Sequence, residues 1–132
     1  MKCLVTGGCG FVGSNLVDKL ISDGHQVIII DNLSTGNKEN LNSEAEFYEK
    51  DISTMNDFSM FKDVDVVFHT AALARVQPSI ENPIKYNEVN IKGTLNMLKA
   101  SVDYGIKRFV YSASSSALGD TDKLPQMESD PP

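Results

Sequence analysis

The sequence predicts an α/β protein built on a doubly wound parallel sheet of about five strands. Short apolar runs recur at wide intervals, and the strongest are continuous rather than alternating, which is typical of strands covered on both faces. Stretches with helical periodicity lie between several of these runs, and strands that alternate with helices pair in parallel through right-handed crossovers. The expected strands are Cys3–Val5, Val27–Ile30, Glu46–Glu49, Asp65–His69 and Arg108–Ser112.

Three helices are expected between these strands. The first ends near Gly24, and a shorter one is expected between Asp51 and Asp63. The longest follows Pro83, because proline suits a first helical turn, and ends near Gly105, where a C-terminal cap belongs. Glycine at position 93, inside this helix, lowers helix stability by about 1 kcal/mol relative to alanine. A glycine kept in spite of this cost indicates that the helix packs closely against a neighbour there. The apolar stripe of the helix consists of Ile91, Leu95, Leu98 and Val102.

The composition excludes several function classes. The chain has 132 residues, which suits one domain, and its 41% hydrophobic and 23% charged residues are typical of a globular protein. A net charge of -6 without a dense Lys/Arg run argues against nucleic-acid and anionic-membrane partners. Cys3 and Cys9 have neither zinc-site nor disulfide spacing, so no metal is expected. No apolar run reaches the ~20 residues of a membrane span, and no signal-peptide pattern is present, which predicts a soluble, cytoplasmic protein.

A glycine-rich segment, VTGGCGFVGSNLV, lies directly after the first strand and opens the first helix. Its early glycines, beginning at Gly7, allow a tight turn, Gly10 lets a pyrophosphate approach the backbone, and Gly13 lets helix and strand pack closely. Free backbone amides and the positive end of the helix favour an anion there. A glycine pattern at a strand–turn–helix junction predicts dinucleotide binding.

Asp31 ends the second strand, 18 residues after Gly13. A carboxylate near this distance accepts hydrogen bonds from the adenosine ribose hydroxyls and repels a 2′-phosphate, so NAD is expected rather than NADP. The alternative is that Asp31 only begins a turn together with Asn32.

Six motifs follow one another along nearly the whole chain: TGGCGFVG, DNLSTG, DI, HTAA, NPIKYNEVNIKGTLNML and FVYSASSSALGD. In this order they resemble the extended short-chain dehydrogenase/reductases, in the branch of NAD-dependent nucleotide-sugar epimerases and dehydratases. The resemblance implies a Rossmann fold with NAD as cofactor. It is nearest to the 4-epimerases of the UDP-glucose/UDP-galactose type, so a UDP-sugar is the expected substrate. In such enzymes hydride leaves C4 of the sugar, a 4-keto intermediate rotates, and hydride returns to the opposite face.

The resemblance implies a set of cofactor-binding residues. The pyrophosphate lies beside the glycine loop, the adenosine ribose and adenine follow along the sheet edge, and small residues after the fourth strand admit the nicotinamide side. Asn90, on the long helix, resembles a family asparagine that contacts the cofactor, although it could instead pair with a backbone group. The full set is Gly7, Gly10, Phe11, Val12, Gly13, Asp31, Asn32, Leu33, Ser34, Thr35, Gly36, Asp51, Ile52, Thr70, Ala71, Ala72, Ala74 and Asn90.

The resemblance also assigns roles around the substrate. The fifth strand of the family ends in a small-residue triplet whose third member is the active-site Ser or Thr, which makes Ser114 the residue that hydrogen-bonds the reacting sugar oxygen. Ser115 and Ser116 are expected to satisfy loop backbone groups. Arg75 and Ser79 are placed on the substrate side, although Arg75 could instead be a solvated charge. Leu118 stands where relatives commonly carry an aromatic residue. His69 is expected to be a packed, hydrogen-bonded residue rather than a base.

The family base is a tyrosine in a YxxxK pair on the helix after this loop, where the lysine lowers the tyrosine pKa. None of the four tyrosines here has a lysine four positions later. We therefore expect a chain truncated after about five strands, with an NAD-binding portion over 1–118, a polar connecting tail over 119–132 and no substrate domain. Such a chain is expected to be inactive alone.

Two other functions stay open. A nucleotide-sugar 4,6-dehydratase or reductase shares the same early motifs, and a non-catalytic dinucleotide-binding module fits a chain without YxxxK. The family commonly pairs through the long helix, so the parent protein is expected to be a homodimer.

Overall fold

The computed structural model describes residues 1–114, 117, 119 and 125–129, and the expectations for Ser115, Ser116, Leu118 and most of the 119–132 tail lie outside these residues. Five strands form one parallel sheet in the order β3-β2-β1-β4-β5. The predicted fold class and all five predicted strands are confirmed. The strands are β1 (Lys2–Thr6), β2 (Gln26–Asp31), β3 (Glu46–Glu49), β4 (Val66–His69) and β5 (Arg108–Tyr111).

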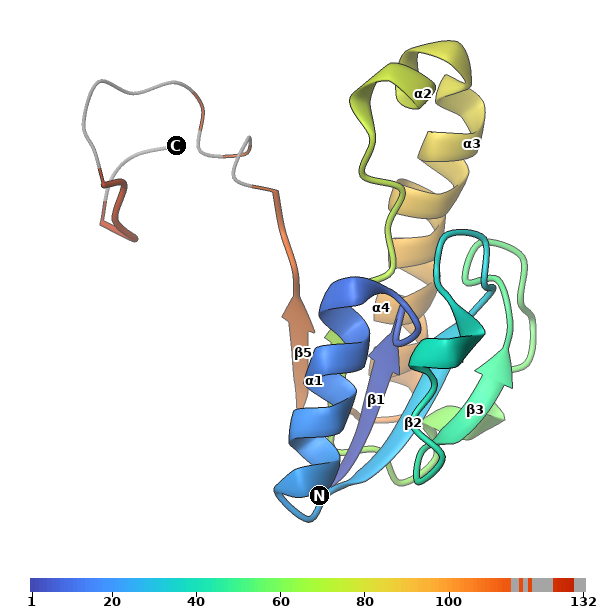
Figure 1. Ribbon diagram of the computed structural model, residues 1–132, viewed down its shortest axis with the longest axis vertical. Coiled ribbons are helices and arrows are strands. Elements are labelled where there is room, and N and C mark those ends of the chain that lie inside the picture. The colour runs from blue at the N-terminus through green and yellow to red at the C-terminus, as the bar shows by residue number, and fades with distance from the viewer. Residues whose placement is uncertain (115–116, 118, 120–124, 130–132) are drawn as a thin grey trace.

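Helices cover both faces of this sheet, with α1 on one side and α4 on the other, while α2 and α3 stand beyond the carboxyl ends of the strands (Figure 1). The long predicted helix is present as α3, a π-helical segment and α4 in unbroken succession. The helices are α1 (Phe11–Ser22), α2 (Val76–Glu81), α3 (Pro83–Asn87) and α4 (Thr94–Asp103), with the π-helical segment Glu88–Gly93 and 3-10 turns at Lys38–Asn40 and Ser59–Phe61.

The core consists of two apolar layers, one on each face of the sheet. On the α4 side, Leu4 of β1 and alternate residues of β2 pack against Met97 and Ala100. On the α1 side, Val5 and the other residues of β2 pack against Val17 and Leu20. Because neighbouring residues of a strand point to opposite faces, a continuous apolar run is what a doubly covered sheet requires.

The helix predicted between Asp51 and Asp63 is wrong: this segment consists of turns followed by the 3-10 turn Ser59–Phe61. The carboxylate of Asp51 accepts the backbone N–H of Ser53 at 2.8 Å, and that of Asp57 accepts the N–H of Ser59 at 2.9 Å. Side chains that take up nearby backbone donors offer the chain an alternative to the helix. Phe61 still reaches the core from this irregular segment.

The apolar stripe of the long helix faces solvent, with Ile91, Leu95 and Val102 exposed by 63%, 62% and 77%. A different side, with Gly93, Met97 and Ala100, faces the sheet. A Cβ on Gly93 would lie 2.8 Å from Ile52 Cδ1, so the close packing predicted for this glycine is confirmed. No helix among the residues that the structure describes is long and apolar enough to cross a membrane.

The strand order reverses between β1 and β4. The chain runs outward through β2 and β3 on one side of β1, then returns to add β4 and β5 on the other. In a doubly wound sheet such a reversal opens a crevice at the carboxyl ends of the strands, where ligands bind.

Candidate cofactor cleft

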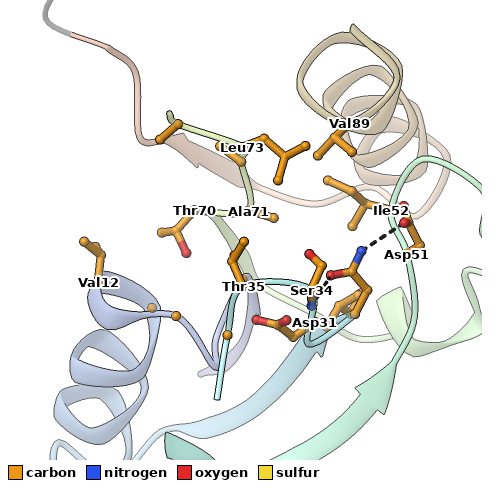
Figure 2. A pocket seen from close by; sticks show the side chains of 18 of the residues that line it. Val12, Asp31, Ser34, Thr35, Asp51, Ile52, Thr70, Ala71, Leu73 and Val89 are labelled. Carbon is orange, nitrogen blue, oxygen red and sulfur yellow. Dashed lines mark hydrogen bonds between the residues drawn. The ribbon is translucent and has the colours of Figure 1, made fainter. Parts of the chain in front are cut away.

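A cleft of about 280 Å³ lies at this point, bounded by the carboxyl ends of β1, β2 and β4 (Figure 2). It is lined by sixteen of the residues expected at a cofactor, from the glycine loop, the DNLSTG segment, the DI pair and the loop after β4. They are Gly7, Gly10, Phe11, Val12, Gly13, Asp31, Asn32, Ser34, Thr35, Gly36, Asp51, Ile52, Thr70, Ala71, Ala72 and Ala74.

The glycine loop is packed so tightly that no side chain fits at Gly7 or Gly13. Gly7 has φ +72, and a Cβ there would lie 2.8 Å from Ala71 Cα. At Gly13 a Cβ would lie 2.1 Å from the Gly7 carbonyl oxygen. The capping residue of α1 is Gly10, which has no side chain to bond the amides of the first turn. The first amides of α1 therefore face the cleft mouth as donors for an anion.

Asp31 lies at the end of β2 and is only 8% exposed. Its Oδ2 accepts the backbone N–H of Cys9 at 3.0 Å, and its Oδ1 accepts that of Leu33 at 2.8 Å. Each carboxylate oxygen has a second acceptor position, so two vicinal hydroxyls can still bind. Leu33, predicted as a cofactor residue, does not line the cleft: it has φ +56 and packs against the α1-side core.

Asp51 and Asn32 form the far end of the cleft, where Asn32 Nδ2 donates to Asp51 Oδ2 at 2.9 Å (dashed in Figure 2). Ser53 adds its backbone N–H and its hydroxyl to Asp51 Oδ1, at 2.8 and 2.6 Å. Burial acts to raise the pKa of the Asp51 carboxyl, but these hydrogen bonds outweigh it and hold the pKa below its ordinary value. The carboxylate is therefore a fixed acceptor at neutral pH.

The opposite end is walled by the loop after β4, where Thr70, Ala71 and Ala72 present small side chains to the cleft. Asn90 lies behind this wall rather than in it: its Nδ2 donates to the Leu73 carbonyl and its Oδ1 accepts the Leu73 N–H, both at 2.9 Å. The structure thus matches the alternative interpretation, in which this asparagine pairs with backbone.

His69 is packed and hydrogen-bonded, as predicted. It is 1% exposed, and its ring contacts the hydroxyls of Thr6 at 2.7 Å and Thr94 at 3.0 Å. Burial lowers the pKa of the imidazole to about 4, so the ring is neutral at pH 7.

Ser114 follows the end of β5 and is exposed, outside the residues that line the cleft. Arg75 and Ser79 line a neighbouring hollow together with Tyr86 and Asn90. The expected substrate-side residues Arg75 and Ser79 therefore lie next to the cleft, in a hollow that shares Leu73 and Ala74 with it.

Four cleft residues escaped the sequence prediction: Ile30, Lys50, Leu73 and Val89. Ile30 and Lys50 immediately precede predicted residues, so widening each motif by one position would have included them. Val89 reaches the cleft from the π-helical segment (Figure 2) and lies inside the NPIKYNEVNIKGTLNML motif, from which only its neighbour Asn90 was assigned to the cofactor.

These features fit a dinucleotide. The glycine cradle admits a pyrophosphate, a buried carboxylate at the second strand suits ribose hydroxyls, and the alanines after β4 leave room for a flat ring. The fold and the cleft together define a dinucleotide-binding protein of the doubly wound α/β class.

The comparison with known families agrees with this class. The sequence pattern of the NAD dependent epimerase/dehydratase family matches residues 3–132, and the chain belongs to that family. A UDP-glucose 4-epimerase of Streptococcus mutans is 35% identical over 136 residues, covering 99% of this chain and 41% of the relative.

Solved structures give the same result. A UDP-glucose 4-epimerase from Thermotoga maritima, crystallised with UDP-glucose, has 43% identity and a TM-score of 0.87, covering 100% of this chain and 44% of that one. A UDP-glucose 4-epimerase from Thermus thermophilus, in complex with NAD, has 34% identity and a TM-score of 0.86, with coverages of 100% and 44%. The chain thus spans less than half the length of these relatives.

Proposed function

We propose that this chain is the NAD-binding part of a nucleotide-sugar 4-epimerase that acts on a UDP-sugar. The observation that carries the proposal is the cleft at the strand reversal, with a tightly packed glycine loop at its centre and a buried carboxylate beside it. The match to UDP-glucose 4-epimerases supports the reaction and the sugar nucleotide. We assign residues 1–118 to this portion and 119–132 to a connecting segment.

Different residues along the cleft bind different parts of the cofactor and substrate. The amides of the glycine loop and of the α1 N-terminus hold the pyrophosphate, Asp31 accepts the ribose hydroxyls, and Asp51 with Ile52 borders the adenine. NAD, when bound, supplies the hydride acceptor and donor for C4 of the sugar. Ser114 hydrogen-bonds the sugar oxygen at that carbon.

No YxxxK pair is present in these 132 residues, so we propose that they do not turn over UDP-sugars by themselves. Robust epimerase activity from the pure chain would show that another base serves the reaction. A 4,6-dehydratase or a reductase has no observation in its favour here.

The solvent-facing stripe Ile91, Leu95, Leu98 and Val102 supports a further part of the proposal, which is that the complete protein is a homodimer through this helix. Solvent-exposed apolar side chains that follow one another along a helix mark an interaction surface.

The cofactor assignment is tested by titrating the chain with NAD and NADP in a calorimeter. We expect Asp31→Asn to weaken NAD binding roughly tenfold to a hundredfold, since a hydrogen bond to a charged group is lost. The ratio of the NAD affinity to the NADP affinity should also decrease. Unchanged NAD affinity in Asp31→Asn would contradict the assignment.

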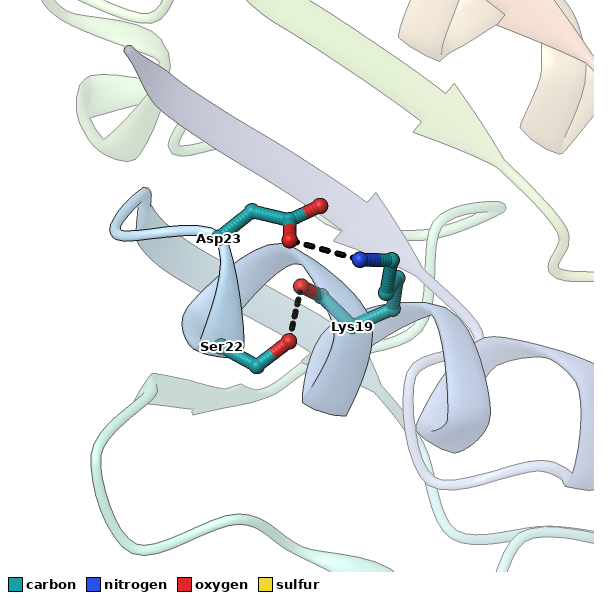
Figure 3. Close-up of polar contacts among 3 residues, drawn as sticks. All are labelled: Lys19, Ser22 and Asp23. Atoms are coloured by element: carbon teal, nitrogen blue, oxygen red, sulfur yellow. Dashed lines mark hydrogen bonds and ion pairs between the residues drawn. The ribbon is translucent and has the colours of Figure 1, made fainter.

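Asp23→Ala is the matched control. Asp23 lies just past the end of α1, opposite the glycine loop, and pairs with Lys19 at 2.6 Å (Figure 3). An exposed pair of this kind contributes about 1 kcal/mol or less to stability, so Asp23→Ala should stay folded. Because Asp23 lies at the other end of α1 from the glycine loop, the NAD affinity should be unchanged.

A further inference from the structure

A closed circuit of hydrogen bonds runs behind the wall of the cleft. Thr6 Oγ1 meets His69 Nδ1 at 2.7 Å, and His69 Nε2 meets Thr94 Oγ1 at 3.0 Å. The Thr94 hydroxyl donates to the Asn90 carbonyl at 2.7 Å, and the Asn90 side chain holds both backbone groups of Leu73.

Both ends of this circuit close on the same loop. The Ala71 N–H donates to Thr6 Oγ1 at 3.3 Å, while Leu73 is held by Asn90. Ala71 and Leu73 both line the cleft. The circuit therefore ties β1, β4 and the long helix to one three-residue stretch of the wall.

The directions of the bonds define the state of the imidazole. A carbonyl only accepts, so the single hydroxyl proton of Thr94 goes to Asn90. Thr94 Oγ1 must then accept from His69, which puts the ring proton on Nε2 and leaves Nδ1 to accept from Thr6. The neutral Nε2–H ring is the tautomer that satisfies every partner.

The third link, from Thr94 to Asn90, lies at the C-terminal end of the π-helical segment Glu88–Gly93. The backbone N–H of Thr94 turns to the Ile91 carbonyl, and the Asn90 carbonyl takes the Thr94 hydroxyl instead. Single π turns inside α-helices occur frequently at functional sites.

We infer that His69, as its neutral Nε2–H tautomer, is a positioning residue that fixes the Ala71–Leu73 wall for the nicotinamide side of the dinucleotide. The ring itself is held in place by Tyr111, which stacks on it with centroids 5.7 Å apart and planes 18° apart, and by Phe109 at 5.6 Å. The name of the ligand rests on the proposed function, whereas the locked wall does not.

The test uses a hydroxyl deletion and its rescue. Thr94→Val removes the link to His69 and Asn90, and Thr94→Ser restores it. In the unliganded chain, ¹⁵N NMR should show the Nε2–H tautomer in wild type and Thr94→Ser, and loss of that single tautomer in Thr94→Val. Amide hydrogen exchange at Ala71 and Leu73 should accelerate roughly tenfold in Thr94→Val. The Gly7 amide, bonded to Ile30 O at 2.8 Å outside the circuit, is the internal control.

Binding adds a second readout. Thr94→Val should weaken NAD binding roughly tenfold. The affinity for ADP, which reaches the Asp31 and Asp51 end and the glycine loop but lacks the nicotinamide side, should change less than about twofold. An Nδ1–H tautomer in wild type, unchanged exchange at Ala71 and Leu73, or equal losses for NAD and ADP would overturn the inference. If wild type binds neither nucleotide, the proposed function fails, and the NMR and exchange results still decide whether the wall is locked.

Discussion

His69 couples the stability of the fold to mildly acidic pH. Burial lowers its pKa from 6.5 to about 4, so between these values the unfolded chain binds a proton that the folded chain does not. Stability should therefore rise with pH from 4 to 6.5 and gain nothing further from this group above that range. The gain amounts to roughly 3 kcal/mol, at 1.36 kcal/mol for each pKa unit.

Urea unfolding at a series of pH values checks this prediction. The carboxyls of Asp51, Asp57 and Asp65 have pKa values below their ordinary value of 3.8, so the stability that they contribute is lost beneath the window in which His69 acts. Equal free energies of unfolding at pH 4.5 and 6.5, or an NMR titration of His69 centred near 6.5, would contradict it.

At the scale of elements, the contact between the long helix and the turn after Asp51 controls one end of the cleft. A methyl group at Gly93 would meet Ile52 Cδ1 and Cγ1 at 2.8 Å. The Ile52 backbone is held by Asn96, whose amide donates to its carbonyl at 2.8 Å. The Ile52 side chain must therefore move, and it lines the cleft.

We expect Gly93→Ala to weaken ADP binding several-fold, by about 1 kcal/mol, although alanine is the better helix former. Adding Ile52→Val, which removes the clashing Cδ1 but keeps a carbon at the Cγ1 position, should restore part of the affinity. Calorimetric titration of the three proteins with ADP measures both effects. Full affinity in Gly93→Ala alone would show that Ile52 yields in another direction.

Some of the elements could be predicted from sequence patterns and others could not. The strands were predictable because burial on both faces demands unbroken apolar runs such as Val27–Ile30. The absence of a helix after Asp51 was not predictable, because Asp51 and Asp57 accept hydrogen bonds from nearby backbone N–H groups and a periodicity argument does not include such bonds. Leu33 and Asn90 belong to cofactor motifs in sequence, yet their side chains face the core and the Leu73 backbone, which depends on tertiary packing.

At the scale of the whole molecule, the outward stripe on the long helix is the surface through which we propose that the complete protein dimerises. Leu95→Glu puts a charge at the centre of an apolar surface, where burial without a partner is costly. We expect dimers of the complete protein to dissociate, with NAD affinity unchanged, as measured by analytical ultracentrifugation.

Lys92→Glu places the same carboxylate on an exposed position outside the stripe and serves as its control. If the Leu95→Glu protein sediments like wild type, the stripe is not part of the dimer interface.

The double engagement of Asp31 has a consequence for anyone redesigning coenzyme preference. The usual strategy replaces the acid at the second strand with a small or basic residue that tolerates an extra phosphate. Here that acid is also the anchor of the Cys9 and Leu33 amides, so the replacement would release two loops at once. A change of coenzyme preference therefore has to supply new hydrogen-bond acceptors for both amides. Variants altered only at position 31 will gain selectivity for the other coenzyme but lose order in the binding site.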